Sequence, residues 1–275
     1  MLKRILSIII LCAVLAPAII GCGTATPPEE TDMTSGNLTD TPTDPITTTE
    51  PATEPPTEPV TEPATDPVTE APAGPITVAC VGDSITEGVG VTNRSVDSYP
   101  AQLQKLLGDG YKVVNCGKSK ATALDPSSKY HNTNGIPYRT TTQYTAGLRA
   151  EPDIVLIMLG TNDAKLVKGS IDESVSDFYE ALKAIGEKFA SLESKPKIYI
   201  VASPYRYEDS IRKANMDSAI IPTQKKLAED MGWGYIDLFT PTKEAVSRNI
   251  HSDKLHFNKD GYALISEIIK NEITK

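Results

Sequence analysis

The stretch ITVACVGDSITEG, residues 76–88, joins a short apolar run to a turn rich in glycine and polar residues. The run is uncharged and ends at Gly82 and Asp83, which is typical of a buried strand that stops at a turn. The pattern recurs four times further along the chain. The later candidate strands are residues 112–115, 153–159, 197–202 and 234–238. Short, nearly continuous apolar strands of this kind indicate a parallel sheet buried on both faces.

Segments with helical spacing of apolar residues separate these strands. Asp97 or Ser98 can cap one helix, which runs to Leu107 and stops at Gly108. The predicted helices are residues 98–107, 172–194, 212–231 and 260–273. Alternation of strand and helix predicts one α/β domain over residues 76–275, with a flavodoxin-like, three-layer α/β/α fold and a five-stranded parallel sheet. In such sheets the chemistry collects at the carboxyl ends of the strands.

Charge is distributed unevenly along the 275 residues, which carry 27 Lys and Arg against 36 Asp and Glu. Residues 23–75 hold eleven acidic side chains and no basic one, whereas residues 1–22 hold only two basic ones. Residues 76–275 therefore contain 25 basic and 25 acidic side chains. This neutral domain is long enough to bury a proper core, and the composition excludes a strongly basic nucleic-acid binder.

The N-terminus has the layout of an export signal. Two basic residues precede an uncharged run over residues 5–20, and Gly21 and Cys22 follow it. The stretch IIGC resembles the lipobox of bacterial lipoproteins, which implies diacylation of the Cys22 thiol and cleavage just before it. We therefore expect residues 1–21 to be a lipoprotein signal peptide and Cys22 to be the site of lipid attachment. The alternatives are an uncleaved signal anchor and ordinary cleavage with an unmodified Cys22. Each version places the rest of the chain outside the cytoplasmic membrane.

Residues 22–75 form a segment of low complexity that is rich in Thr, Pro and Glu. From Thr49 the chain repeats every four residues as threonine, an acidic residue, proline and a variable residue. Proline in each repeat prevents a helix. Low hydrophobicity and charge of one sign predict a disordered, extended linker that holds the following domain away from the membrane. A merely solubilising segment is the alternative, and its threonines could also carry sugars.

Four polar motifs lie at the ends of predicted strands or just before the last helix. They are GDSITEG at residues 82–88, NCGKSKAT at 115–122, GTND at 160–163 and SDKLHFN at 252–258. In order and position they resemble the conserved blocks of the SGNH (GDSL-type) hydrolase superfamily, and the resemblance covers essentially all of residues 76–275. One such tetrapeptide would be a weak signal, but four ordered motifs are specific. The resemblance implies the SGNH hydrolase fold and a serine hydrolase that acts on ester bonds.

The same resemblance assigns a catalytic triad. It makes Ser84 the nucleophile, His256 the general base and Asp253 the group that orients the imidazole. The D-x-x-H spacing lets the carboxylate reach the ring nitrogen that does not face the serine. Taken alone, Ser84 would be a turn or helix-cap serine, the common use of serine after Gly-Asp. We expect ester hydrolysis to decline in acid as His256 becomes protonated.

An oxyanion hole is implied as well, but one of its positions departs from the family pattern. Members supply the backbone N–H of the serine, a backbone N–H from the second motif and a side-chain amide from the third; Ser84 and Asn162 match the first and last. Counting N-x-x-x-S-G from Asn115 puts the expected glycine at Lys120. We expect Lys120 to donate its backbone N–H, with Gly117 as the alternative donor. A weakened or altered enzyme is the other interpretation of Lys120.

Four further polar residues near the motifs receive simpler interpretations. Asp83 and Asp163 are expected to brace loops through hydrogen bonds from their carboxylates to the backbone. His251 lies outside the D-x-x-H match and is predicted to be a surface histidine. His131 is interpreted as an ordinary or substrate-lining residue of the loop 127–139.

The positions of the cysteines predict neither a disulfide bond nor a metal site. Cys80 and Cys116 end what should be adjacent parallel strands, which rarely present disulfide geometry, so we predict small buried thiols. The sequence has no Cys/His spacing of a metal site and no glycine-rich phosphate loop. The reaction is therefore expected to need neither metal nor cofactor.

The substrate is inferred from the setting of the domain. A surface tether and a neutral domain of low aromatic content suit an enzyme acting on extracellular polymers. We expect a carbohydrate O-acetylesterase acting on a polysaccharide such as acetylxylan. The loops 88–96 and 121–139 supply side chains suited to sugar contact, although their composition equally describes solvated loops. These side chains are Tyr130, His131, Asn132, Asn134, Tyr138 and Arg139.

Two other functions stay open. The first is a lysophospholipase or thioesterase that cleaves single-acyl lipids, which would require an apolar channel beside Ser84. The second is a tethered surface-binding protein that has lost turnover, for which Lys120 is the motive. The expected partners are an acylated carbohydrate or other small ester and the membrane that holds the lipid anchor, with no nucleic acid. The expected location is the cell surface.

Overall fold

The computed structural model describes residues 74–165, 171–207 and 211–275. The predicted signal peptide, Cys22 and nearly all of the predicted linker lie outside the described residues. Within these ranges, no helix combines the length and the apolar character needed to span a membrane.

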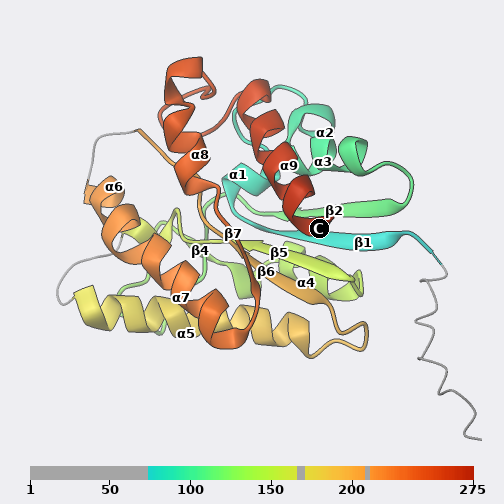
Figure 1. Ribbon diagram of the computed structural model, residues 1–275. Coiled ribbons are helices and arrows are strands. Elements are labelled where there is room, and N and C mark those ends of the chain that lie inside the picture. The colour runs from blue at the N-terminus through green and yellow to red at the C-terminus, as the bar shows by residue number, and fades with distance from the viewer. Residues whose placement is uncertain (1–73, 166–170, 208–210) are drawn as a thin grey trace, which may run out of the picture. The chain divides into compact units, whose positions relative to one another are not determined.

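A parallel sheet of five strands forms the centre of the described domain (Figure 1). The strands are β1 (Ile76–Gly82), β2 (Tyr111–Gly117), β5 (Ile154–Met158), β6 (Lys197–Val201) and β7 (Gly234–Ile236). Their order is β2-β1-β5-β6-β7. This is the flavodoxin-like order, in which β2 lies on one side of β1 and the later strands are added on the other side. The predicted fold class and all five predicted strands are confirmed.

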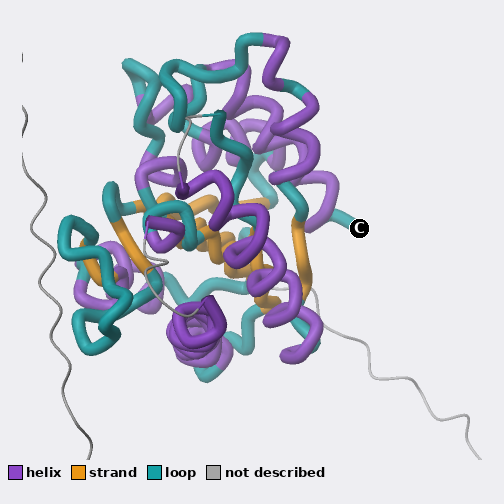
Figure 2. Tube along the Cα trace, turned by 90° about the vertical axis from the view of Figure 1, so that its left-hand side faces the viewer, coloured by secondary structure: helices purple, strands orange, loops and turns teal. Residues whose placement is uncertain are grey.

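Helices cover both faces of the sheet. Helices α3 (Tyr99–Leu107) and α9 (Lys259–Ile273) pack on one face, and α4 (Thr142–Arg149), α5 (Ile171–Ala190) and α7 (Ile221–Met231) pack on the other. Figure 2 shows the strands between these two helical layers. The remaining short elements are α1 (Ser84–Glu87), α2 (Arg94–Asp97), β3 (Ala121–Thr122), β4 (Ile136–Pro137), α6 (Ile211–Asn215) and α8 (Phe239–Glu244).

Strand β1 explains why the apolar run is continuous rather than alternating. Ala79 and Val81 belong to the core on the α5 side, whereas Val78 and Cys80 belong to the core on the α3 and α9 side. All four side chains are fully buried. Full burial of a side chain such as valine contributes about 1.5–3 kcal/mol, so a polar residue at either set of positions would be costly.

Register places three of the four motifs side by side. Gly82, the last residue of β1, pairs with Gly117 at the end of β2 and with Met158 at the end of β5. The chain segments that follow these strands therefore leave the sheet at one edge. This edge is where the candidate site lies.

The structure differs from the predicted helices in two ways. The predicted helix 212–231 is divided into α6, a π-helical turn over Met216–Ile220 and α7, and Pro222 at the start of α7 cannot donate a backbone hydrogen bond. Helices α4 and α8 were not predicted. Each has a single buried residue, Gly147 and Thr242 respectively, and α4 adds only the partly buried Tyr144 and Leu148, so the apolar stripe that identifies a helix in sequence is weak in both.

Candidate active site

Ser84 stands at the first position of α1, directly after β1. Asp83 caps this helix, because its Oδ1 accepts the backbone N–H of Ile85 over 2.9 Å. Gly82 is required by close packing: a Cβ there would lie 2.1 Å from the Thr86 hydroxyl and 2.8 Å from the Met158 carbonyl oxygen. The G-D-S sequence thus sets a tight turn that fixes the serine hydroxyl at the sheet edge.

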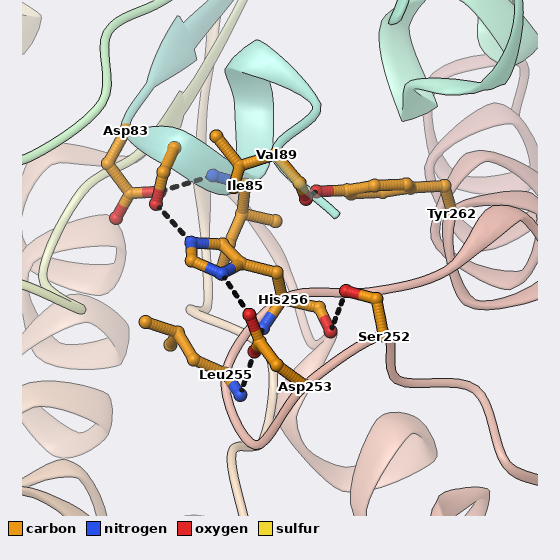
Figure 3. A network of polar contacts seen from close by, with 9 residues as sticks. Asp83, Ile85, Val89, Ser252, Asp253, Leu255, His256 and Tyr262 are labelled. Carbon is orange, nitrogen blue, oxygen red and sulfur yellow. Dashed lines mark hydrogen bonds and ion pairs between the residues drawn. The ribbon is translucent and has the colours of Figure 1, made fainter. Parts of the chain in front are cut away.

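The structure brings the three predicted triad residues together, and Figure 3 shows the ring of His256 beside Asp253. The Nε2 atom of His256 lies 3.0 Å from the Oγ of Ser84, and its Nδ1 lies 2.8 Å from Oδ2 of Asp253. The other carboxylate oxygen of Asp253 accepts the backbone N–H groups of Leu255 and His256, each over 2.6 Å. One carboxylate therefore both closes the D-x-x-H turn and orients the ring.

Electrostatics favour the working form of this triad. Partial burial acts to raise the pKa of Asp253, but hydrogen bonds from the backbone and ring of His256 outweigh it and hold that pKa below its ordinary value. The carboxylate is thus ionised at neutral pH and accepts the Nδ1–H of His256. The Nε2 atom then faces Ser84 as an acceptor, which is the arrangement a general base requires.

Candidate donors for an oxyanion lie on the segments that follow β1, β2 and β5. The backbone N–H of Ser84 is at the start of α1, where it has no acceptor within the helix. Lys120 has φ of 67°, in the left-handed region that favours glycine, and its N–H has no hydrogen-bond partner in the described part of the chain. Asn162 donates from Nδ2 to the carbonyl of Ala121 over 3.0 Å and to Oδ2 of Asp83 over 3.5 Å, which places its side-chain amide next to the residue that precedes Ser84. The N–H of Gly117, the alternative donor, is instead engaged by Oδ1 of Asn115 over 2.9 Å.

The loop that carries Lys120 is held by Glu87, a residue to which sequence reasoning assigned no role. Oε2 of Glu87 accepts the backbone N–H of Ser119 over 2.6 Å and its hydroxyl over 2.5 Å, while Oε1 pairs with Arg94. Partial burial opposes ionisation, but these hydrogen bonds together with the nearby cations lower the pKa of Glu87. Glu87 belongs to the GDSITEG motif, so its place in that motif was the available signal.

Asp83 and Asp163 brace loops, as predicted. Asp83 does so through its cap on the Ile85 N–H. Asp163 accepts the backbone N–H groups of Ala123 and Leu124 over 3.1 and 3.0 Å. Both carboxyl groups are fully buried. Burial raises the pKa of Asp83 to about 6 and that of Asp163 to about 7, although the backbone hydrogen bonds act in the opposite direction.

Arg206 is a second residue of this region that sequence reasoning missed. It follows β6, is 1% exposed, and its Nη1 donates to the carbonyl oxygen of Thr161 over 3.2 Å. Its charge also acts to lower the pKa of Asp83. A single arginine after a strand carries no distinctive sequence signal; only its position at a strand's carboxyl end could have drawn attention to it.

The prediction for His251 is wrong. Its exposed fraction is 7%, because an antiparallel bridge to Phe257 folds the residue beneath the D-x-x-H hairpin. The ring stacks on Phe257 with centroids 4.4 Å apart, and Nε2 donates to the carbonyl of Tyr205 over 3.2 Å. Burial lowers the pKa of His251, so the ring is neutral at pH 7.

Two residues expected to contact sugar belong to the core instead. Tyr130 is 5% exposed and donates its hydroxyl to Glu173, and Tyr138 is fully buried and donates to the carbonyl of Cys116 over 2.7 Å. The same loop does reach the site through Asn132, whose amide donates to the carbonyl of Asn162 over 3.4 Å. His131 is half-buried, and burial lowers its pKa.

Asn134 and Arg139 are the remaining side chains of the loop 127–139 that were expected to contact sugar. Asn134 is exposed, and Arg139 forms an ion pair with Asp125.

Cys80 and Cys116 are free, buried thiols, as predicted, and burial raises the pKa of both, to about 11 for Cys116. Over the ranges that the structure describes, no group of three or more His, Cys, Asp or Glu side chains is placed to hold a metal ion.

The α/β fold and the contacts between Ser84, His256 and Asp253 are typical of serine hydrolases. Comparison with known proteins gives the family to which the chain belongs. The chain belongs to the GDSL-like lipase/acylhydrolase family, whose model matches residues 80–264. An acetylxylan esterase of Xylanibacter ruminicola is 33% identical over 207 residues, which is 70% of this chain and 42% of that protein. This chain thus spans less than half the length of that relative.

Solved structures share the fold. The lipase/acylhydrolase from Enterococcus faecalis is 22% identical, covers 72% of this chain and 95% of its own, and has a TM-score of 0.55. A carbohydrate acetylesterase family member from Sinorhizobium meliloti is also 22% identical, covers 72% of this chain and 97% of its own, and has a TM-score of 0.51.

Proposed function

We propose that this protein hydrolyses O-acetyl esters of carbohydrates through an acetyl-enzyme on Ser84. The observation that carries the proposal is the continuous hydrogen-bonded series from Ser84 through His256 to Asp253, with distances of 3.0 and 2.8 Å. Such a series serves acyl transfer, because the serine loses its proton to the imidazole as it attacks.

The steps follow from these positions. The Oγ of Ser84 attacks the ester carbonyl carbon while Nε2 of His256 takes its proton, and the N–H groups of Ser84 and Lys120 and the Asn162 amide stabilise the oxyanion. The protonated His256 then gives its proton to the leaving sugar oxygen. Water, deprotonated by His256, attacks the acetyl-enzyme and releases acetate and free Ser84. Asp253 holds the ring orientation in both halves of the reaction.

A carbohydrate substrate is supported by the acetylxylan esterase relative and by polar groups around the serine. Asn162 and Ser252 lie on loops near the triad and keep part of their surface exposed, and their polar groups can hydrogen-bond to sugar hydroxyl groups. A lipid substrate would instead be favoured by an apolar channel. We therefore place acetylated polysaccharides ahead of long-chain esters.

The location of the enzyme is part of the proposal. The signal-like N-terminus, Cys22 and the Thr/Pro/Glu-rich repeat support a lipid-anchored domain held outside the cytoplasmic membrane by an extended linker. Mass spectrometry of the mature N-terminus tests this. A diacylated Cys22 is the expected result, and an unmodified Cys22 contradicts the anchor.

Acetate release tests the catalytic proposal. Wild type and the Ser84→Ala variant are compared on acetylated xylan, acetylated mannan and long-chain glycerol esters. We expect release of acetate from acetylated carbohydrate that falls at least about a thousand-fold in the variant. Cleavage of long-chain esters alone would favour the lipolytic alternative, and serine-dependent cleavage of none of them, with oligosaccharide binding retained, would favour a binding protein.

A further inference from the structure

Tyr207 is an aromatic side chain in the loop after β6, at the sheet edge that carries the triad. Its exposed fraction is 41%. Among the described residues the other large apolar side chains with comparable exposure, Val96 and Leu106, lie on α2 and α3. Exposure of a tyrosine ring costs hydrophobic stabilisation, so a ring kept exposed beside a candidate site is a candidate contact for a ligand.

The ring of Tyr207 is held in place from below. It meets the imidazole of His251 edge to face, with centroids 4.9 Å apart and an interplanar angle of 81°. His251 is itself buried, stacked on Phe257 and hydrogen-bonded to the carbonyl of Tyr205. An aromatic ring fixed in this way loses little side-chain entropy on binding a ligand.

Two neighbours of Tyr207, His251 beneath its ring and Arg206 before it in the chain, connect it to the region of the proposed triad. His251 pairs with Phe257 in the hairpin whose turn carries Asp253 and His256, and the N–H of Ser252 donates to the carbonyl of His256 over 2.9 Å. On the other side, Arg206 precedes Tyr207 and bonds to the carbonyl of Thr161, next to Asn162. The Tyr207 ring thus packs on the hairpin that carries Asp253 and His256, and the residue before it is bonded to the loop of Asn162.

We infer that Tyr207 is a stacking platform for a sugar ring of the acetylated substrate. The inference rests on the proposed carbohydrate O-acetylesterase function. A pyranose presents a face of C–H groups that packs on an aromatic ring, while the tyrosine hydroxyl can bond to a sugar hydroxyl. Tyr130 and Tyr138 are buried and cannot provide this surface, and the same holds for the other aromatic residues near the hairpin, Tyr205, Phe257 and Tyr262. Tyr207 thus selects sugar esters over small esters that have no ring to stack.

The test compares one sugar substrate with one small ester. Acetylated xylo-oligosaccharides and ethyl acetate are assayed with wild type, Tyr207→Leu, which removes the aromatic face, and Tyr207→Phe, which keeps it. In Tyr207→Leu, the ratio of kcat/KM for the oligosaccharide to kcat/KM for ethyl acetate should fall about ten-fold, mainly through KM. In Tyr207→Phe it should stay within about two-fold, because the ring remains. Leu106→Ala, which shortens a similarly exposed side chain on α3, is the matched control and should leave the ratio unchanged.

Using a ratio separates loss of the platform from general damage to the hairpin, which would lower both rates together. An unchanged ratio in Tyr207→Leu overturns the inference, as does an equal fall in Tyr207→Phe. Oligosaccharide binding to Ser84→Ala, measured by calorimetry with and without Tyr207→Leu, gives a readout independent of turnover. If wild type cleaves neither ester, the proposed function fails, while a loss of binding in the double variant would still support the platform.

Discussion

The guanidinium of Arg206 donates a hydrogen bond from Nη1 to the carbonyl oxygen of Thr161 over 3.2 Å, in the interior of the protein. Thr161 precedes Asn162, so this bond joins the loop after β6 to the loop that carries the proposed oxyanion donor. Burial raises the pKa of Asp83, the residue before Ser84, and the same cation acts against that rise. One buried charge therefore acts on the segments that carry the proposed nucleophile and the proposed oxyanion amide.

Replacing Arg206 by methionine should lower kcat for acetylated xylan about ten- to a hundred-fold and change KM little, because the Asn162 amide loses its fixed position. Arg206→Lys keeps the charge but not the planar donor group, so its kcat should lie between that of wild type and that of Arg206→Met. Steady-state kinetics measure both variants, with the exposed Arg248→Met as the control. Equal losses in all three arginine variants, or a loss confined to KM, would contradict a positioning role.

Asp253 should contribute to the rate chiefly by orienting His256. In Asp253→Asn the amide oxygen can still accept the backbone N–H groups that close the turn, but the ring nitrogen loses its charged partner. We expect kcat to fall about a hundred-fold or more with the fold intact. Ser252→Ala, one residue away, is the control and should lose far less. Near wild-type turnover in Asp253→Asn would mean that another group orients the base.

Much of the fold was predictable because its signals are local. A continuous apolar run ending in Gly82 and Asp83 identifies a buried strand without knowledge of its neighbours. The triad was assigned through the resemblance of its motifs, and the pairing of Asp253 with His256, three residues away, needs only one turn. Ser84 joins them because parallel strands end at one edge of the sheet.

What the sequence did not reveal depends on contacts between distant segments. His251 is buried because Phe257 and the loop after β6 close over it, and Arg206 is buried against a loop 45 residues earlier in the chain. Tyr130 resembles a solvated loop residue until Glu173 of α5 accepts its hydroxyl. Each environment is created by tertiary packing, which residue type and local spacing do not encode.

Lys120 carries a backbone strain that glycine would relieve. Its φ of 67° is costly for a residue with a Cβ, so Lys120→Gly should raise the free energy of unfolding by about 1 kcal/mol, as measured by urea denaturation. Lys118→Gly, in the same loop but without positive φ, should be destabilising and is the matched control. The glycine keeps the backbone N–H, so we expect ester hydrolysis to persist in Lys120→Gly. Destabilisation by both substitutions would show that Lys120 adopts this conformation without strain.

Burial of Asp83 should make stability depend on pH in a defined direction. Its pKa is about 6 in the folded protein against an ordinary value of 3.8, so between these values the folded state binds more protons than the unfolded chain. The stability that Asp83 contributes is therefore full below about pH 4 and is lost as the pH rises through about 6. Asp83→Asn cannot titrate, and its amide oxygen can still cap Ile85.

Over this window the free energy of unfolding of wild type should fall relative to Asp83→Asn by up to about 1.4 kcal/mol per pH unit and then level off. Urea denaturation at pH 4, 5, 6 and 7 measures the difference, which also includes the coupling between the two carboxyl groups because the charge of Asp83 acts to raise the pKa of Asp163. The exposed Asp109→Asn should give a curve parallel to that of wild type. A parallel curve for Asp83→Asn as well would mean that Asp83 remains ionised throughout, held by Arg206 and the Ile85 N–H against the cost of burial.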